Sequence, residues 1–260
     1  MQYIYEANKK AWDNNVKEGN PWTIPVTHKQ IEAAKRGNWE VLLTNCRPVP
    51  RHWFPDLKGL DVLCLASGGG QQASILAAAG ANVTVLDLSP AQLEQDRLVA
   101  EREGLFLRIV EGSMDNLLMF DDQEFSLIFH PISNLFCPEV RPVWREAYRV
   151  LRPGGHLLAG FVNPVIYLFD NDLEEKGIYQ LKYSLPYSDV SCLTQEERDT
   201  YFGKGAALEF SHTLEDQIGG QTDVGFHIIG FYESYVDDEK IKEYMPSFIA
   251  TRALKPAKGK

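Results

Sequence analysis

Apolar and polar residues alternate along the central part of the chain in blocks that predict strands and helices in turn. Short apolar runs predict strands over 61–66, 82–87, 106–110, 124–129 and 155–162. Between these runs, helices are expected near 71–79, 90–103 and 138–151. Strands that alternate with helices favour a parallel sheet with helices on both faces. The sequence therefore predicts an α/β fold with a doubly wound, mostly parallel sheet.

The segment from Asp61 to Ser89 is the most informative part of this pattern. Its strand leads into Gly68, Gly69 and Gly70, where missing side chains permit unusual φ values and let a ligand approach the main chain. The next strand places Asp87 at its carboxyl end, about 20 residues after the glycines. A carboxylate there can accept hydrogen bonds from ribose hydroxyls. The segment thus predicts a nucleoside-containing cofactor at the carboxyl edge of the sheet.

Two other interpretations of the glycine segment remain open at this point. The spacing Gly68-x-Gly70-x-x-Ala73 also fits a loose dinucleotide fingerprint, which would suit an NAD(P)-dependent oxidoreductase. The glycines could instead serve only tight strand-to-helix packing. Two later segments bear on the choice. A polar loop follows the third strand at 109–115, and Pro-Gly-Gly at 153–155 ends a helix and begins the fifth strand.

Together these residues resemble class I S-adenosylmethionine-dependent methyltransferases over about Lys58 to Val162, and the segment Val150-Leu151-Arg152-Pro153-Gly154-Gly155 is the most specific part. The resemblance implies S-adenosyl-L-methionine as the cofactor. It also implies a Rossmann-like sheet of seven strands, completed by the apolar runs at 225–232 and 248–253, with the last strand antiparallel.

The resemblance further implies a set of cofactor contacts. In that family the glycine loop lies against the methionine portion of the cofactor, the acidic end of the second strand holds the ribose hydroxyls, and the loop after the third strand lines the adenine. These roles, with a further contact after the fourth strand, would fall here to Ala66, Ser67, Gly68, Gly70, Asp87, Leu88, Gln92, Ser113, Met114, Asp115 and His130.

Three positions depart from the family pattern. Cys64 stands where the first strand usually carries Asp or Glu, Ala66 occupies a usual glycine position, and Ser113 stands at a usual Asp. Asp115, two residues after Ser113, is expected to approach the adenine amino group instead. These departures leave open a chain that binds S-adenosylmethionine as a catalytically inactive sensor or partner subunit.

Methyl transfer from a sulfonium mainly requires that the protein align a nucleophile with the methyl carbon and exclude water. A general base helps where the acceptor is a hydroxyl or an acidic carbon. His130, directly after the fourth strand, is the candidate base, and a cofactor-lining or purely structural histidine is the alternative. Asn134 could align an acceptor or cap the helix that follows.

The flanking segments are expected to cover the site. Residues 1–57 are rich in aromatic side chains and predict an N-terminal helical cap, in which Trp22 could cover the cofactor or receive the substrate. Residues 163–222 predict a substrate-covering insertion, with a small antiparallel flap of two strands at 181–187 and 208–213 and a helix near 213–218; residues 223–260 then return to the core of residues 58–162. Candidate pocket residues on the flap, with ordinary cap packing as the alternative, are Tyr183, Tyr187 and His212.

Composition narrows the classes of partner. The chain has 26 Lys and Arg against 36 Asp and Glu, a net charge of −10, which argues against nucleic acid as a ligand. Its four cysteines are widely spaced and lack a nearby histidine array, so no metal site is expected. We expect these cysteines to be reduced thiols in a cytoplasm. No apolar run approaches the ~20 residues of a membrane helix, and no secretory signal precedes the first strand. The sequence predicts a cytoplasmic methyltransferase for a small molecule, with the acceptor, the methylated atom and the oligomeric state left open.

Overall fold

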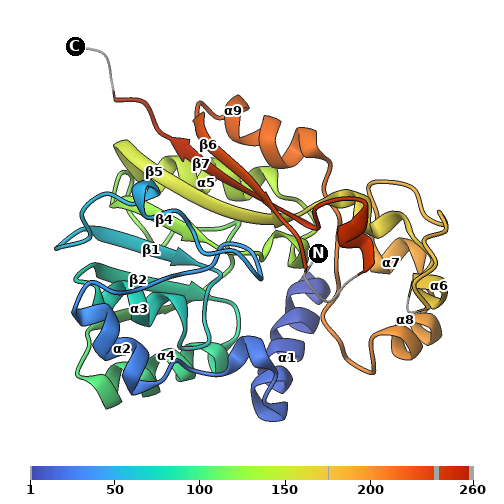
Figure 1. The fold of residues 1–260 in the computed structure, drawn as a ribbon, viewed down its shortest axis with the longest axis horizontal. Coiled ribbons are helices and arrows are strands. Elements are labelled where there is room, and N and C mark those ends of the chain that lie inside the picture. The colour runs from blue at the N-terminus through green and yellow to red at the C-terminus, as the bar shows by residue number, and fades with distance from the viewer. Residues whose placement is uncertain (1, 175, 237–239, 258–260) are drawn as a thin grey trace.

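A seven-stranded sheet forms the centre of the protein (Figure 1). The computed structural model describes residues 2–174, 176–236 and 240–257. The sheet has the order β3-β2-β1-β4-β5-β7-β6 and consists of β1 (Asp61–Leu65), β2 (Asn82–Asp87), β3 (Leu107–Glu111), β4 (Phe125–His130), β5 (Leu151–Val162), β6 (His227–Ser234) and β7 (Phe248–Leu254). Neighbours from β3 to β5 are parallel, and β7 is antiparallel to both β5 and β6. The predicted sheet, including its antiparallel last strand, is confirmed.

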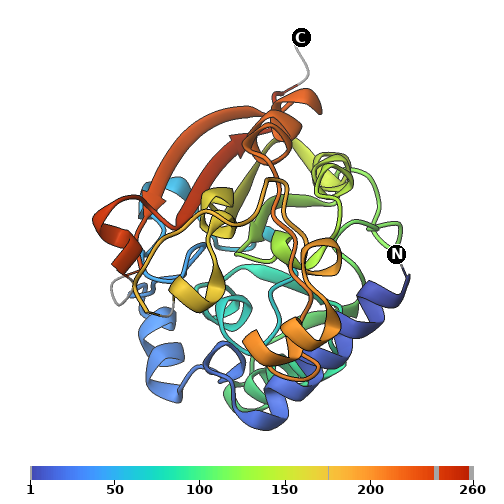
Figure 2. The ribbon, with the colours of Figure 1, turned by 90° about the vertical axis from the view of Figure 1, so that its right-hand side faces the viewer.

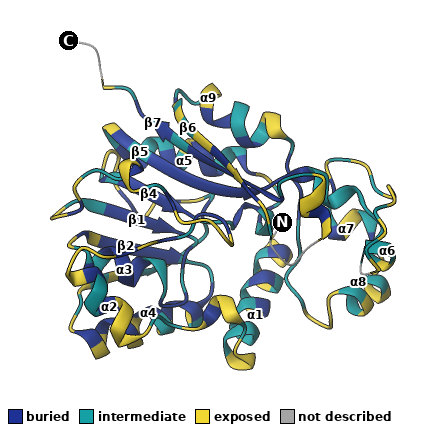
Figure 3. Cartoon of the chain, in the orientation of Figure 1, coloured by how far each residue is buried: buried dark blue, intermediate teal, exposed yellow. Residues whose placement is uncertain are grey.

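Helices cover both faces of the sheet and create two apolar cores. Along β1, Val62 and Cys64 point into one core, whereas Leu63 and Leu65 point into the other. The first core lies under α2 (His28–Lys35), α3 (Gln72–Ala78) and α4 (Pro90–Glu103); the second lies under α5 (Arg141–Val150). Figure 3 shows the strands as the most buried layer. A continuous apolar strand is therefore required at β1.

The start of α4 is fixed by local chemistry at its first residues. Ser89 Oγ accepts a hydrogen bond from Gln92 N at 3.1 Å, and Pro90 occupies the first helical position. Gly104, with φ of 64°, ends the helix. The observed bounds match the predicted 90–103. Because β2 ends only two residues before Ser89, this cap also fixes the position of Asp87.

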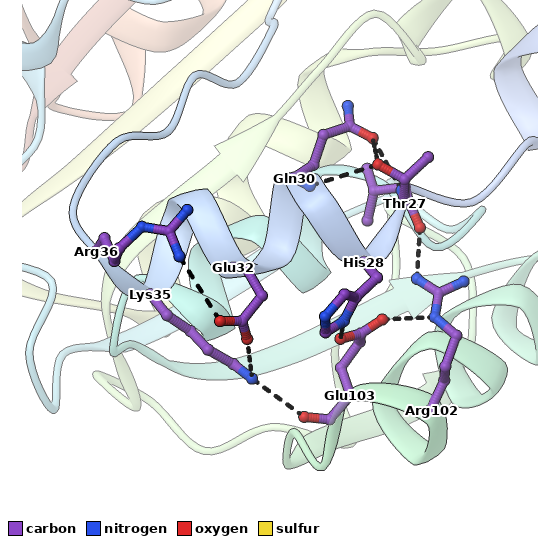
Figure 4. Close-up of polar contacts among 9 residues, drawn as sticks. Thr27, His28, Gln30, Glu32, Lys35, Arg36, Arg102 and Glu103 are labelled. Carbon is purple, nitrogen blue, oxygen red and sulfur yellow. Dashed lines mark hydrogen bonds and ion pairs between the residues drawn. The ribbon is translucent and has the colours of Figure 1, made fainter.

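The N-terminal segment is helical, as expected, and extends along the cavity described below. Helix α1 (Gln2–Glu18) is joined to α2 by a bend that contains the turn Pro21–Thr23. Contacts between α2 and α4 hold this bend in place (Figure 4). Arg102 Nη2 donates to the Val26 carbonyl oxygen at 2.5 Å, and His28 Nδ1 lies 2.7 Å from Glu103 Oε2.

The segment after β5 is mostly irregular and lies over the carboxyl ends of the strands, facing the viewer in Figure 2. Its short helices are α6 (Asn171–Glu174), α7 (Asp189–Cys192) and α8 (Gln195–Tyr201). In place of the expected antiparallel flap, Ser188 forms an isolated bridge with Phe210, and Leu181 bridges to Phe169 instead. A regular ladder does not form because backbone donors are used by side chains: Tyr187 N donates to Ser211 Oγ and Glu209 N to Asp189 Oδ2.

The helical segment expected near 213–218 does not lie over the cavity. It forms a π-helical turn, Glu215–Gly219, that continues into α9 (Gly220–Asp223). Trp144 of α5 donates from Nε1 to the Asp216 carbonyl oxygen at 2.9 Å, and Arg141 pairs with Asp216 and Asp223. This segment therefore packs against α5 and covers the sheet.

Candidate active site

A cavity of about 520 Å³ lies at the carboxyl ends of the parallel strands. One side is formed by the loops after β1, β2, β3 and β4; the others are formed by α1 with the following bend and by the insertion. Its charged lining residues are Asp87, Asp189 and Glu209, and the described part of the lining includes no Lys, Arg or His. All formal charge that faces the cavity is therefore negative.

The glycine loop and Asp87 form one unit at the bottom of this cavity. Gly68 N donates to Asp87 Oδ2 and Ser89 N to Asp87 Oδ1, each at 2.9 Å. Burial raises the pKa of Asp87, and the two N–H donors oppose this shift. A Cβ at residue 68 would lie 2.8 Å from Gln92 Cβ and 3.0 Å from Asp87 Oδ2, so only glycine fits. The backbone thus orients both carboxylate oxygens.

A second carboxyl group, which the sequence reasoning missed, lies beneath the same loop. Asp96 of α4 is fully buried, and its Oδ2 accepts a hydrogen bond from Gly69 N at 3.0 Å. Burial raises the pKa of Asp96 to about 8, so this group is protonated at neutral pH. Cys64 lies nearby, and burial, then the Asp96 charge, raise the pKa of its thiol. A signal existed: Asp96 is three residues from Leu93 and from Val99, on the buried face of α4.

Two buried polar atoms in the lining have no hydrogen-bond partner among the described residues, namely Ser67 Oγ and Gln92 Oε1. Buried polar groups are normally paired, so these atoms indicate a polar ligand. The other predicted cofactor residues that line the cavity are Ala66, Gly68, Asp87, Leu88, Ser113 and Met114. The structure thus brings together most of the set expected around the glycine loop and after β3.

Asp115 and Gly70, two of the expected contacts, lie outside the cavity lining. The carboxylate of Asp115 accepts hydrogen bonds from Tyr5 Oη and from Ser113 Oγ, both at 2.5 Å. Asp115 therefore links α1 to the loop after β3 and does not present its side chain to a ligand. Gly70 instead uses its carbonyl oxygen to accept from Val26 N at 2.9 Å, which joins the glycine loop to the N-terminal bend.

His130 also lies outside the lining, although its position directly after β4 had suggested a base. Its side chain is fully buried; Nδ1 lies 2.8 Å from the Leu65 carbonyl oxygen and Nε2 lies 2.6 Å from Asn134 Oδ1. Burial lowers the pKa of His130, so the ring is neutral and donates its single N–H to one of these two oxygens. The expectation of a catalytic or cofactor-lining His130 is corrected: the imidazole joins two core loops. Asn134 continues this buried network, with Nδ2 donating to Gln217 Oε1 at 2.9 Å.

Of the remaining substrate-pocket candidates, Trp22 lines the cavity, whereas Tyr183, Tyr187 and His212 do not. Tyr187 Oη donates to Asp189 Oδ1 at 2.7 Å, and His212 Nε2 lies 2.9 Å from the Asn134 carbonyl oxygen. These contacts correspond to the cap-packing alternative. The bend that carries Trp22 is held over the glycine loop, because Gln71 Nε2 donates to the carbonyl oxygens of Pro21 and Ile24.

The insertion supplies three polar lining residues that the sequence reasoning missed, namely Tyr167, Asp189 and Glu209. Tyr167 Oη donates to Glu209 Oε2 at 2.8 Å, and Asp189 Oδ2 accepts from Glu209 N at 2.7 Å. Burial raises the pKa of Glu209 to about 7, while the Tyr167 hydrogen bond opposes this shift. A weak signal was present, because Glu209 is a lone acid between the apolar residues Leu208 and Phe210.

Helix α1 closes the cavity by linking two distant loops. Asn8 is buried, and its Nδ2 donates to the carbonyl oxygens of Phe136 at 2.9 Å and Leu208 at 3.1 Å. Its Oδ1 accepts from Leu208 N at 2.6 Å, and Trp12 contacts the edge of Phe136 at 5.2 Å between ring centroids. A single side chain of α1 thus joins the loop after β4 to the insertion.

Comparison with known proteins agrees with this geometry. A family model described as a methyltransferase domain matches residues 63–159. The chain is 51% identical over 258 residues to the uncharacterized methyltransferase YbaJ of Bacillus subtilis (strain 168), an alignment that covers 98% of this chain and 100% of the relative. It is also 26% identical over 174 residues to methyltransferase phqN of Penicillium fellutanum, covering 66% of this chain and 47% of that protein.

Solved structures share the fold at low sequence identity. An S-adenosylmethionine-dependent methyltransferase from Mesorhizobium loti matches with a TM-score of 0.60 at 20% identity, covering 78% of this chain and 94% of that chain. An arsenic(III) S-adenosylmethionine methyltransferase from Chlamydomonas reinhardtii matches with a TM-score of 0.54 at 22% identity, covering 90% of this chain and 75% of that chain. In the part of the chain that the structure describes, no helix is long and apolar enough to cross a membrane, and no cluster of metal-ligating side chains occurs.

Proposed function

Because the chain belongs to the class I S-adenosylmethionine-dependent methyltransferases, we propose that it methylates a small molecule held in the cavity between the sheet edge and the insertion. The observation that carries this proposal is the arrangement of the cavity walls. Strand-end loops form one wall, the insertion forms the opposite wall, and Asn8 fastens α1 to both. Such a cavity suits a small acceptor better than a macromolecular one.

The lining fits the cofactor S-adenosyl-L-methionine, which supplies a methyl group on a positively charged sulfur. Asp87, with both oxygens oriented by backbone N–H groups, would hold the ribose hydroxyls. Gly68 lets the backbone approach Asp87 and Gln92 closely, and the unpartnered Ser67 Oγ and Gln92 Oε1 offer polar contacts. An acidic lining, in which the described residues include no Lys, Arg or His, also suits a cationic ligand. Ala66, Leu88, Ser113 and Met114 would complete the contact set.

Calorimetric titration with S-adenosylmethionine and S-adenosylhomocysteine tests the assigned contacts. Asp87→Ala removes the acceptor of two backbone donors and of the proposed ribose hydrogen bonds, so cofactor affinity should fall by roughly 1–3 kcal/mol. Asp121→Ala, at an exposed residue outside the lining, is the matched control and should bind as the wild type does. Equal affinity of Asp87→Ala and wild type would remove Asp87 from the site.

The class of acceptor can be tested without knowing its identity. Cell extract is incubated with the enzyme and methyl-labelled S-adenosylmethionine, then separated by size into small molecules and macromolecules. We expect enzyme-dependent label among the small molecules, and we expect Asp87→Ala to reduce it. Label found in protein or nucleic acid alone would overturn the small-molecule proposal and leave the cofactor assignment intact.

A further inference from the structure

The insertion side of the cavity presents a carboxyl group that the cofactor contacts do not use. Glu209 lines the cavity, and its Oε2 accepts the hydrogen bond from Tyr167 Oη at 2.8 Å. No described residue donates a hydrogen bond to Oε1 of Glu209. One oxygen is therefore held in place by the protein, and the other is available to a ligand.

The neighbouring carboxylate, Asp189, is fully committed to the fold. Its Oδ1 accepts from Tyr187 Oη and its Oδ2 from Glu209 N, both at 2.7 Å. Arg198 Nη1 donates to the Asp189 carbonyl oxygen at 2.9 Å; burial raises the pKa of Asp189, and the charge of Arg198 opposes this shift. The groups that face Glu209 are thus the Tyr167 hydroxyl and the Asp189 carboxylate, with Arg198 behind Asp189. After burial, the charge of Asp189 is a further cause of the raised pKa of Glu209.

Aromatic side chains also contribute to the lining of this cavity. Tyr167 stacks on Tyr187 with 5.2 Å between ring centroids, and Trp12, Phe136, Phe202 and Phe248 are further lining residues. Aromatic faces and carboxylates both attract cations, and a wall without basic residues disfavours an anionic acceptor. The lining therefore favours a positively charged head group on an apolar body.

Resting on the proposed function, we propose that the acceptor is an amine on an aromatic or apolar body, and that Glu209 is the catalytic base that binds its protonated nitrogen. The N–H proton moves from the ammonium to Oε1 of Glu209. The nitrogen lone pair that this frees forms the bond to the methyl carbon, while the electrons of the broken carbon–sulfur bond stay on sulfur. Glu209 then releases the proton to water. A base that titrates near neutral pH accepts this proton more readily than an ordinary glutamate.

Three probes with one aromatic body separate the acceptor classes: phenethylamine, phenethyl alcohol and phenylacetate. Their binding is measured by calorimetry on the full chain loaded with S-adenosylhomocysteine. We expect the amine to bind about tenfold or more tightly than the alcohol, and phenylacetate to bind weakest. Glu209→Gln, which still accepts from Tyr167, should lose this preference, whereas Glu196→Gln on the exposed face of α8 should keep it. An equal or reversed order, the absence of binding by all three, or a preference that survives Glu209→Gln would overturn the proposal.

Turnover of the bound amine tests the base role separately. We expect methylation of phenethylamine by the wild type, and about a hundredfold lower turnover in Glu209→Gln with unchanged S-adenosylmethionine affinity. No methylation by the wild type, or turnover of Glu209→Gln within about threefold of the wild-type turnover, would overturn the assignment.

Tyr167→Phe is a second variant, which keeps the carboxyl group of Glu209 and removes the hydrogen bond that lowers its pKa. The acidic limb of its rate profile should therefore move to higher pH, and an unchanged profile would also count against Glu209. Failure of the wild type to bind S-adenosylmethionine would instead contradict the cofactor assignment.

Discussion

The two sides of the cavity are held together by different kinds of contact. On the strand-end side, backbone N–H groups of Gly68, Gly69 and Ser89 donate to the carboxyl groups of Asp87 and Asp96. On the insertion side, side chains such as Tyr167 and Glu209 contact each other, on segments whose helices span only four to seven residues. The strand-end side is thus positioned by the sheet, and the insertion side by a few individual side-chain pairs.

This difference separates two tasks within one enzyme. Loops anchored by a buried sheet are rigid, which suits a cofactor whose shape does not vary. A wall built from side-chain pairs can change its residues without disturbing the sheet, which suits the recognition of a particular acceptor. Changes to the first wall should therefore alter the stability of the whole protein and cofactor affinity, whereas changes to the second should alter acceptor binding and local structure.

The largest expected effect is on the pH dependence of folding stability, to which one buried acid on each side of the cavity contributes. Asp96, with a pKa of about 8, keeps a proton in the folded state that the unfolded state loses near pH 4, so folding stability falls as pH rises between these values. Asp96→Asn should remove this loss. Its free energy of unfolding should therefore rise relative to that of the wild type by roughly 1.4 kcal/mol per pH unit across that window. Urea unfolding at several pH values measures the gain.

Glu209→Gln provides the comparison, since Glu209 has a pKa of about 7 and thus a narrower window between about pH 4 and 7. Asp121→Asn, at an exposed aspartate, should show no such pH-dependent gain. A flat difference between Asp96→Asn and wild type would contradict a protonated Asp96 in the folded state.

Gly68→Ala tests whether the glycine loop on the strand-end side can accommodate an added side chain. The added Cβ would lie 2.8 Å from Gln92 Cβ and 3.0 Å from Asp87 Oδ2, so the loop must shift and the carboxylate must lose its alignment. We expect cofactor affinity to fall by about 2–3 kcal/mol, measured by calorimetry. Gly219→Ala is the matched control, since its added Cβ meets only Glu215 Cγ at 3.6 Å. Wild-type affinity in Gly68→Ala would show that the loop adjusts freely.

Asn8→Ala addresses the connection between the two sides. It removes three hydrogen bonds and leaves the N–H of Leu208 without its acceptor, so we expect a loss of about 1–3 kcal/mol in the free energy of unfolding. Hydrogen exchange should rise near residue 208 and much less in β1. Asn14→Ala on the same helix, where Asn14 accepts one long bond of 3.4 Å from Lys17, should have little effect. Equal exchange in wild type and Asn8→Ala would show that α1 does not hold the insertion.

A pair of helix caps gives the smallest and most direct comparison. Ser89 caps α4 on the strand-end side, and Thr194 caps α8 in the insertion through a capping box. Each change to Ala should cost about 1 kcal/mol of helix stability. For Ser89→Ala we expect this cost in global unfolding together with weaker cofactor binding, because Ser89 N orients Asp87. For Thr194→Ala we expect faster hydrogen exchange confined to the insertion; the same global loss in both variants would remove the distinction.

The parts that were predicted from the sequence depend on short-range chemistry. The bounds of α4 follow from Ser89, Pro90 and Gly104, and the site at Asp87 follows from a glycine turn one strand earlier. These signals lie within about 20 residues of the feature that they predict. Strand periodicity, likewise local, was sufficient to predict the five strands of the parallel part, whereas the completion to seven strands came from the family resemblance.

The parts that were missed depend on contacts between distant residues. Asn8 meets partners 128 and 200 residues away, and Tyr167 meets Glu209 across 42 residues of irregular chain. His130 was expected in the cavity because of its place after β4, yet its ring lies between Leu65 and Asn134 inside the core. No local pattern reports such pairings, because they are decided by how the loops pack after the sheet has formed.

The position of α1 has a consequence for the order in which the cavity is assembled. Tyr5 and Asp13 of α1 contact Asp115 and Ser89, whereas the partners of Asn8 lie at Phe136 and Leu208. The helix can therefore dock beside the first strands before the insertion is in place, but the bonds of Asn8 can form only afterwards. A single asparagine thus completes the reaction chamber only once both of its walls exist.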